Sequence, residues 1–269
     1  MRFIDSLKTA WQQQNSLVCV GLDPDIKRLP VHLGQERSAI FEFNKQLVDA
    51  TAEYACCFKP QIAYYAAVGA EGELEKTIAY IKQHYPTIPV ILDAKRGDIG
   101  ATADMYAVEA FGRYGADALT VNPYMGGDTI EPYLAYKDKG VVVLCRTSNS
   151  GSGEFQSLQA DGEPLAWHVA KRAVDWNKDQ QVMLVVGATY PEELGQIREL
   201  VGDMPLLVPG IGAQGGDLAA VMQHGVDSEG LGLMINSSRG IIYASSGKDF
   251  AAAAANEAKA MRDQINVHR

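Results

Sequence analysis

Short runs of β-branched and other apolar residues recur along the chain, and between them apolar residues repeat every three or four positions. Continuous apolar runs of this length are typical of strands buried on both faces. They follow one another at intervals of roughly 25 to 40 residues, which is the length of a strand-plus-helix unit. The eight predicted strands are Leu17–Leu22, Cys57–Ile62, Val90–Lys95, Ala118–Asn122, Val141–Arg146, Met183–Gly187, Leu206–Pro209 and Leu231–Asn236.

The segments between these runs show the 3.6-residue period of amphipathic helices. The predicted helices include Ile40–Tyr54, Leu74–His84, Ala101–Tyr114 and Leu165–Trp176. An additional helix over Phe3–Gln14 is expected before the first strand, and an alanine-rich helix over Phe250–Met261 is expected as the last element.

Eight alternations of strand and helix predict an α/β fold, a (β/α)8 TIM barrel. The length of 269 residues allows one domain or two, but no Pro-, Gly- or Ser-rich linker is long enough to divide the chain. We therefore expect residues 1–269 to form a single barrel domain with an extra N-terminal helix. The alternative is a doubly wound open sheet, although its dinucleotide-binding form is disfavoured because no G-x-G-x-x-G follows the first strand.

The charge balance narrows the possible partners. Apolar residues make up 47% and charged residues 21% of the chain, a globular composition that excludes intrinsic disorder as the main state. Lys and Arg number 24 against 33 Asp and Glu, so the formal net charge is −9. We expect binding to neither nucleic acid nor membrane surfaces, because both require a basic face. An anionic ligand must be held by a few well-placed groups.

The N-terminus and the cysteines indicate a cytoplasmic protein. Asp5 and Lys8 interrupt the stretch in which a secretory signal needs unbroken apolar residues. No run approaches the roughly 18 apolar residues of a membrane span. The four cysteines lie in or beside apolar runs and form no C-x-x-C pair, which predicts reduced core thiols. No two of the five histidines have ligand spacing, so we expect no histidine-based metal site.

Charged residues gather at the end of the third predicted strand, where a barrel places its chemistry. Asp93 and Lys95 are two residues apart and therefore project to the same face. Lys59 comes from the neighbouring strand, and Asp98 lies just beyond, before the next helix. Two lysines and two carboxylates would form an alternating array that keeps the lysines protonated and able to donate protons. The alternative is a structural salt-bridge cluster in which Asp98 is only a helix N-cap.

A glycine-rich segment follows the seventh predicted strand and precedes a helix. Its Gly210–Gly216 stretch offers unobstructed backbone N–H groups, which form anion sites at helix N-termini. Arg239, at the end of the eighth strand, would supply a bidentate charge partner. In barrels this place is a recurrent phosphate site. The alternative is an ordinary glycine-rich turn beside a surface arginine.

Two other segments at the predicted barrel mouth are ambiguous. The segment Thr147–Gln156 is longer and richer in Ser and Gly than a strand-to-helix loop requires, so it is either a lid over the substrate or a mobile surface loop. Asp23 is either a ligand for a sugar hydroxyl or a cap for the turn before Pro24.

Five motifs follow one another at the ends of the predicted strands. They are F-K-P at Phe58–Pro60, D-A-K-R-G-D-I-G-A-T at Asp93–Thr102, T-S-N at Thr147–Asn149, P-G-I-G-A-Q-G-G-D at Pro209–Asp217 and S-S-R-G at Ser237–Gly240. Taken in order, they are similar to those of the orotidine 5'-phosphate decarboxylase family, in its longer bacterial branch. The similarity covers nearly the whole chain, from Leu22 to Arg239. The D-x-K-x-x-D core is specific in this context, although D-x-K alone is shared with sister barrels.

This resemblance implies a homodimeric barrel that decarboxylates orotidine 5'-monophosphate to uridine 5'-monophosphate, the last step of de novo pyrimidine synthesis. It implies no metal and no organic cofactor. Lys95 is then the proton donor to C6 of the pyrimidine, and Asp93 lies beside the departing carboxylate. Lys59 holds the array and a ribose hydroxyl.

The resemblance also assigns binding roles. Asp98 and Thr102 would reach the active site of the neighbouring subunit. Ser150 stands where this branch commonly has proline, so the resemblance does not determine the local conformation of the predicted lid. The implied substrate contacts are Asp23 to the ribose, Ser148 to the pyrimidine, and Gln214 and Arg239 to the phosphate.

Two alternative functions remain open from the sequence. A sister barrel acting on a sugar phosphate, as a decarboxylase or an aldolase-type synthase, would use the same D-x-K with a magnesium ion. A non-catalytic barrel would bind a phosphate ligand without turnover, although the intact Lys95 and both carboxylates argue against this.

Overall fold

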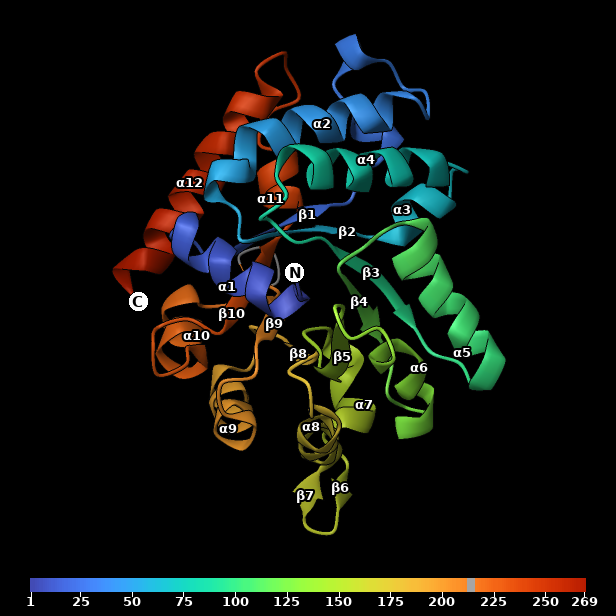
Figure 1. The fold of residues 1–269 in the computed structure, drawn as a ribbon. Coiled ribbons are helices and arrows are strands. Elements are labelled where there is room, and N and C mark those ends of the chain that lie inside the picture. Colours follow the sequence, from blue (N-terminus) through green and yellow to red (C-terminus); the bar gives the residue numbers. More distant parts are fainter. Residues whose placement is uncertain (212–215) are drawn as a thin grey trace.

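The computed structural model describes residues 1–211 and 216–269. Eight parallel strands form one sheet, surrounded by helices (Figure 1). All eight predicted strands are present, with bounds that differ from the prediction by no more than two residues. The strands are β1 (Val18–Leu22), β2 (Cys57–Pro60), β3 (Ile91–Arg96), β4 (Ala118–Val121), β5 (Gly140–Arg146), β8 (Val182–Val186), β9 (Leu206–Pro209) and β10 (Leu233–Ser237).

The sheet curves into a nearly closed barrel, which confirms the predicted fold class. Its hydrogen-bonded order is β2-β1-β10-β9-β8-β5-β4-β3. The two end strands, β2 and β3, meet through parallel bridges between Phe58 and Val90 and between Gln61 and Asp93. Because every pairing is parallel, all carboxyl ends meet at one rim, where barrel enzymes place their chemistry.

The helices lie where the periodicity predicts them. The last helix, α12, extends six residues beyond the predicted Met261 because Ile265 is also buried. The α-helices of the described residues are α1 (Phe3–Gln13), α2 (Ala39–Thr51), α3 (Ile62–Ala66), α4 (Glu71–His84), α5 (Gly100–Ala107), α6 (Glu131–Leu134), α7 (Gly153–Gln156), α8 (Leu165–Trp176), α9 (Pro191–Val201), α10 (Leu218–Gly225), α11 (Arg239–Ile242) and α12 (Phe250–Val267).

Three local features differ from the prediction. Ile62 begins α3 instead of ending a strand, because the side chain of Gln61 accepts a hydrogen bond from the Ala63 N–H and caps the helix. The predicted helix Ala101–Tyr114 changes after Ala107 into a π-helical turn. A short antiparallel hairpin of β6 (Gln159–Ala160) and β7 (Glu163–Pro164) projects from the barrel before α8 (Figure 1). Its strands have no buried residue, so no apolar pattern marks them.

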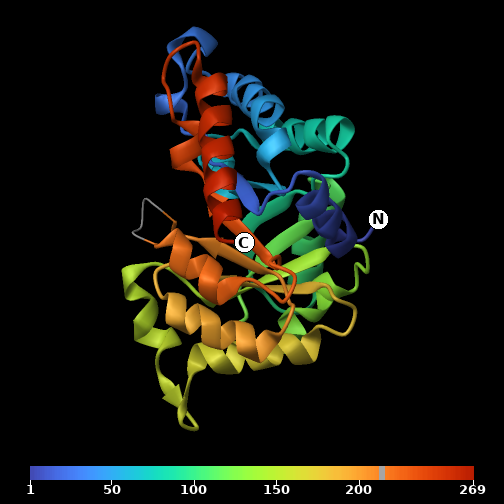
Figure 2. The ribbon, with the colours of Figure 1, turned by 90° about the vertical axis from the view of Figure 1, so that its left-hand side faces the viewer.

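Helix α1 covers the end of the barrel opposite the carboxyl rim. The Trp11 indole donates to the carbonyl of Leu233, at the start of β10, over 3.0 Å. Phe3 packs so closely against Gly140, the first residue of β5, that a Cβ there would lie 2.7 Å from the Phe3 ring. This end is therefore closed by apolar packing, and α12 packs on the outside of the barrel against α2 and β1 (Figure 2). No helix of the described residues is long and apolar enough to cross a membrane.

Candidate active site

Two adjoining cavities open at the carboxyl rim. The first has a volume of about 440 Å³, and the second, of about 290 Å³, shares its Pro209 wall. Lys59, Asp93 and Lys95 line the first cavity, together with Ser148. Asp23 and Arg239 line the second. The predicted charge array and the predicted phosphate site thus lie in adjoining cavities, on the two sides of Pro209 at the end of β9.

Three members of the predicted charge array are in direct contact. The carboxylate of Asp93 accepts from the Lys59 ammonium at 2.9 Å through one oxygen and from the Lys95 ammonium at 2.6 Å through the other. The Lys59 side chain is 6% exposed and the Asp93 side chain 11%, whereas that of Lys95 is 46% exposed. Lys95 is therefore the cation with direct access to a ligand.

A distorted strand end gives Lys95 this position. The pairing of β3 with β4 shifts register between Leu92 and Arg96, and Lys95 has a φ of +48°, a left-handed conformation that non-glycine residues rarely adopt. The hydroxyl of Thr120, on β4, accepts from the N–H groups of Ala94 and Lys95, both at 2.9 Å. These bonds satisfy backbone donors that the shifted ladder leaves unpaired, and so support the strained turn.

Thr120 also fixes the central carboxylate. Its hydroxyl donates to Asp93 at 2.9 Å and it is 1% exposed. The sequence does not mark this residue as functional, because threonine is common in buried strands and one hydroxyl inside an apolar run carries no distinctive pattern. A possible signal was its place two residues after the start of β4, directly beside the charged end of β3.

The electrostatics favour the charged forms of Asp93 and Lys59. Burial alone would raise the pKa of Asp93, but the ammonium groups of Lys59 and Lys95 outweigh it and hold that pKa well below its usual range. Burial alone would lower the pKa of Lys59, but the carboxylates of Asp93 and Asp23 outweigh it and raise that pKa. The array therefore keeps its negative centre and its buried positive neighbour ionised at neutral pH.

Asp98 and Thr102 do not join the array within one chain. The Asp98 carboxylate accepts from the N–H of Ile99 at 2.8 Å, and in the described chain no ion pair links it to either lysine. Thr102 lies exposed in the first turn of α5, which points away from the barrel axis (Figure 1). The predicted four-residue array is therefore a three-residue array in this chain.

The second cavity is lined by a partly buried aspartate and an exposed arginine. One carboxylate oxygen of Asp23 is buried and has no hydrogen-bond partner among the described residues. Arg239 begins α11 and is exposed at the cavity wall. Gly210 has a φ of +103°, a conformation that only glycine adopts without strain. Gln214, the other predicted phosphate contact, lies outside the described residues.

Ser148 lines the first cavity together with the charge array, and it lies in the segment between β5 and the β6–β7 hairpin. Its backbone rests against Gly187, where a Cβ would lie 2.7 Å from the Ser148 nitrogen, so only glycine permits this approach. Within residues 1–211 and 216–269, no cluster of three or more His, Cys, Asp or Glu side chains is arranged to hold a metal ion.

Comparison with known proteins places this geometry in a family. The sequence profile of the orotidine 5'-phosphate decarboxylase / HUMPS family matches residues 16–255. The chain is 60% identical over 270 residues to an orotidine 5'-phosphate decarboxylase of Ralstonia pickettii, covering 100% of both chains. It is 57% identical over 267 residues to one of Janthinobacterium, covering 99% of this chain and 98% of that relative.

Solved structures agree with the sequence comparisons. The structure of Leishmania donovani OMP decarboxylase superposes with a TM-score of 0.87 at 40% identity, covering 100% of this chain and 99% of that chain. A Toxoplasma gondii structure described as an orotidine-monophosphate-decarboxylase superposes with a TM-score of 0.90 at 36% identity, covering 99% and 96%. The chain therefore belongs to the orotidine 5'-phosphate decarboxylase / HUMPS family.

Proposed function

We propose that this chain decarboxylates orotidine 5'-monophosphate to uridine 5'-monophosphate and carbon dioxide, the last step of the de novo synthesis of uridine 5'-monophosphate. The observation that carries the proposal is the Lys59–Asp93–Lys95 array beside a second cavity containing Arg239. The relatives at 57% to 60% identity bear the name of this activity.

In the proposed reaction, the bond between C6 of the pyrimidine and its carboxylate breaks, and carbon dioxide leaves. The electron pair remains on C6, beside the Lys95 ammonium, which stabilises the developing charge and gives its proton to that carbon. Lys95 regains a proton from solvent. Asp93 lies next to the departing carboxylate and disfavours the bound ground state, while Lys59 holds Asp93 in place.

We assign the second cavity to the ribose phosphate. Arg239 offers a planar pair of donors to a phosphate, and the unpartnered oxygen of Asp23 accepts from a ribose hydroxyl. Ser148, at the far wall of the first cavity, contacts the pyrimidine. Gln214 is assigned to the phosphate on the sequence resemblance alone.

We further propose a homodimer in which Asp98 and Thr102 complete the partner's site. In support, Asp98 contacts neither lysine of its own chain, and large apolar side chains near it are exposed, with Ile99 60% and Met105 61% exposed. Mixing the separately inactive Lys95→Ala and Asp98→Ala proteins tests this. Random re-pairing is expected to restore about a quarter of wild-type activity, since half the dimers are hybrids with one intact site. No recovery would refute the shared site.

We place the protein in a reducing compartment, the cytoplasm. All four cysteines are buried free thiols, and burial raises the pKa of Cys145 to about 12, which leaves it a poor nucleophile.

The proposed activity is tested by the loss of orotate ultraviolet absorbance when orotidine 5'-monophosphate is supplied, measured with and without a chelator. We expect rapid loss that the chelator does not change. A chelator-sensitive activity on a sugar phosphate would identify the magnesium-dependent sister reaction instead. Binding of uridine 5'-monophosphate without turnover of the substrate would identify a non-catalytic barrel.

A further inference from the structure

The segment 147–156 forms one wall of the first cavity but has almost no packing of its own. Thr147, Ser148, Asn149 and Gln156 line that cavity. Of the ten residues in this segment, all described, only Ser152 is buried, and its one large apolar residue, Phe155, is 60% exposed. Because apolar burial does not fix the segment, polar contacts must determine its position.

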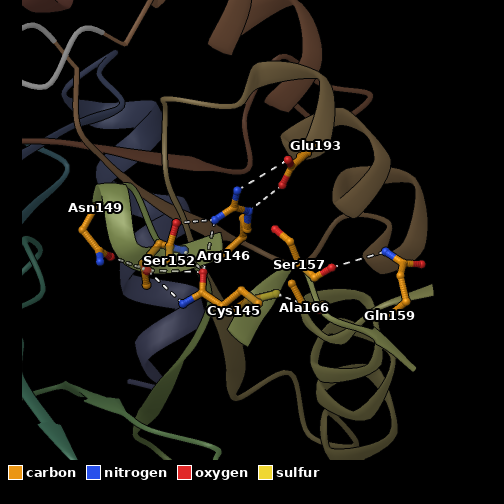
Figure 3. Close-up of polar contacts among 10 residues, drawn as sticks. Cys145, Arg146, Asn149, Ser152, Ser157, Gln159, Ala166 and Glu193 are labelled. Atoms are coloured by element: carbon orange, nitrogen blue, oxygen red, sulfur yellow. Dashed lines mark hydrogen bonds and ion pairs between the residues drawn. The ribbon is translucent and has the colours of Figure 1, made fainter. Parts of the chain in front are cut away.

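Those contacts converge on Arg146, the last residue of β5 (Figure 3). Arg146 is 3% exposed, and one of its terminal nitrogens donates to the Ser152 hydroxyl. The same nitrogen lies 3.4 Å from the side-chain oxygen of Gln156. The guanidinium therefore reaches both the middle and the end of the segment, including its one buried residue.

The other edge of the guanidinium is held by the start of α9. Arg146 donates to the Glu193 carboxylate at 2.5 Å through Nε, and its guanidinium carbon lies 4.0 Å from the centre of the Tyr190 ring. Glu193 stands in the first turn of α9, where the helix dipole favours a negative charge. One side of Arg146 is thus anchored to a rigid helix, and the other side carries the cavity wall.

Gln156 also forms hydrogen bonds to Thr147, at the start of the segment, which lines the cavity. Its side-chain oxygen accepts from the Thr147 N–H at 2.8 Å, and its side-chain nitrogen donates to the Thr147 hydroxyl at 2.9 Å. Thr147 in turn donates to Asn149 at 2.7 Å. The two ends of the segment are therefore joined around Ser148, which lies between Thr147 and Asn149.

We propose that Arg146 is a positioning residue, which clamps segment 147–156 between β5 and α9 so that Ser148 is held at the pyrimidine end of the cavity. The proposal rests on the proposed decarboxylation for the identity of the ligand. It predicts that the clamp governs affinity for the base and leaves affinity for the ribose phosphate unchanged, because Asp23 and Arg239 lie outside the clamped segment.

The test compares two ligands in Arg146→Met, which keeps the length of the side chain and removes its donors. Titration calorimetry is expected to show at least roughly tenfold weaker binding of uridine 5'-monophosphate, since charge-assisted hydrogen bonds are lost. Binding of ribose 5-phosphate is expected to stay within about twofold of wild type. Unchanged nucleotide affinity, or equal weakening of both ligands, would overturn the proposal.

Arg146→Lys separates the clamp from a simple ion pair. Lysine keeps the charge beside Glu193, but its single ammonium does not span Glu193, Ser152 and Gln156 together. We expect it to bind uridine 5'-monophosphate nearly as weakly as Arg146→Met. Full rescue by lysine would show that only the link between β5 and α9 matters, and would refute the clamp.

Two further variants guard against loss of folding. Arg198→Met is the matched control, because Arg198 is a buried arginine that donates to backbone carbonyls at the opposite end of the barrel. It is expected to lower the melting temperature without changing nucleotide affinity. Should Arg146→Met not fold, Ser152→Ala removes the loop partner while Arg146 and Glu193 stay, and the same selective loss is expected at smaller size.

A measurement without ligand separates this proposal from the proposed function. Hydrogen exchange of Arg146→Met is expected to be faster at residues 147–156 and unchanged at residues 91–96. If wild type fails to bind uridine 5'-monophosphate, the proposed function fails, while faster exchange confined to 147–156 still supports the clamp. Unchanged exchange in that segment refutes the clamp whatever the activity.

Discussion

The charged sides of the two cavities, the first wall with Asp93 and the second wall with Asp23 and Arg239, are built in opposite ways. At the ends of β2, β3 and β4, the carboxylate of Asp93 is saturated by Lys59, Lys95 and Thr120 within the chain itself. At the ends of β1 and β10, Asp23 has a buried oxygen without a partner among the described residues, and Arg239 is exposed. The first wall is organised within the chain itself, whereas the second would be completed by the proposed substrate.

This difference matches the role that we propose for each wall. A charge array that acts on a transition state is most effective when its dipoles need no rearrangement during the reaction. A phosphate-binding wall contributes through affinity, and its binding energy can stabilise the reactive arrangement at a distance. Changes to the first wall should therefore affect folding and catalysis together, while changes to the second should affect catalysis alone.

The largest combined effect is expected for Asp93→Asn. Removing the carboxylate leaves the Lys59 ammonium buried without its closest counter-charge, which costs roughly 3 to 5 kcal/mol of folding free energy. Denaturant unfolding should show this loss, and the activity of the remaining folded protein should be abolished. A fully stable Asp93→Asn protein would break the comparison, because it would show that the array is not an organised unit.

Arg239→Ala tests the other wall. The arginine is exposed, so the free energy of unfolding is expected to change by less than about 0.5 kcal/mol. Loss of a bidentate phosphate contact should lower kcat/KM by roughly 100-fold or more, mainly through KM. Steady-state kinetics and denaturant unfolding on the same preparation give both numbers. A large loss of stability in this variant would erase the contrast between the walls.

Thr120→Val gives a smaller effect on the first wall. The substitution keeps the shape but removes the hydroxyl that accepts from Ala94 and Lys95 and donates to Asp93. Leaving these buried groups unsatisfied is expected to cost roughly 1 to 3 kcal/mol and to reduce kcat. The matched control is Thr9→Val, which changes a threonine on α1 far from the rim. If Thr120→Val behaves like this control, Thr120 has no part in the site.

The smallest expected effect is the change with pH in the stability that Asp93 contributes. The folded protein holds the pKa of Asp93 below its unfolded value of about 4, so the stability from this group is present above pH 4 and is lost as the pH falls further. The stability difference between wild type and Asp93→Asn should therefore shrink below about pH 4, measured by thermal unfolding across pH. A difference that stays constant would contradict the ionised array.

Much of the fold and part of the site follow from the sequence alone. The apolar runs predict all eight strands because parallel barrel strands are buried on both faces, and Asp93 and Lys95 fall on one face because strand side chains alternate. The β6–β7 hairpin escaped prediction because nothing in it is buried. The features that were predicted correctly come from patterns among residues that are close in the sequence.

The parts that the sequence did not reveal depend on neighbours in space. Thr120 and Arg146 act through partners on other elements, and a lone threonine or arginine at a strand end has no distinctive pattern. The left-handed backbone at Lys95 is equally hidden, because lysine is not a residue that marks such a turn. Asp98 stands apart from the array of its own chain, which the spacing of the charged residues did not indicate and only the family resemblance implied.

The central claim is that Lys95 carries the chemistry, and turnover by Lys95→Ala at saturating orotidine 5'-monophosphate tests it most directly. The side chain of Lys95 is 46% exposed, so the variant is expected to fold and to bind uridine 5'-monophosphate, which calorimetry verifies. We predict no detectable loss of orotate absorbance under conditions in which the wild type consumes all the substrate. Turnover at the wild-type rate by the folded variant would contradict the account.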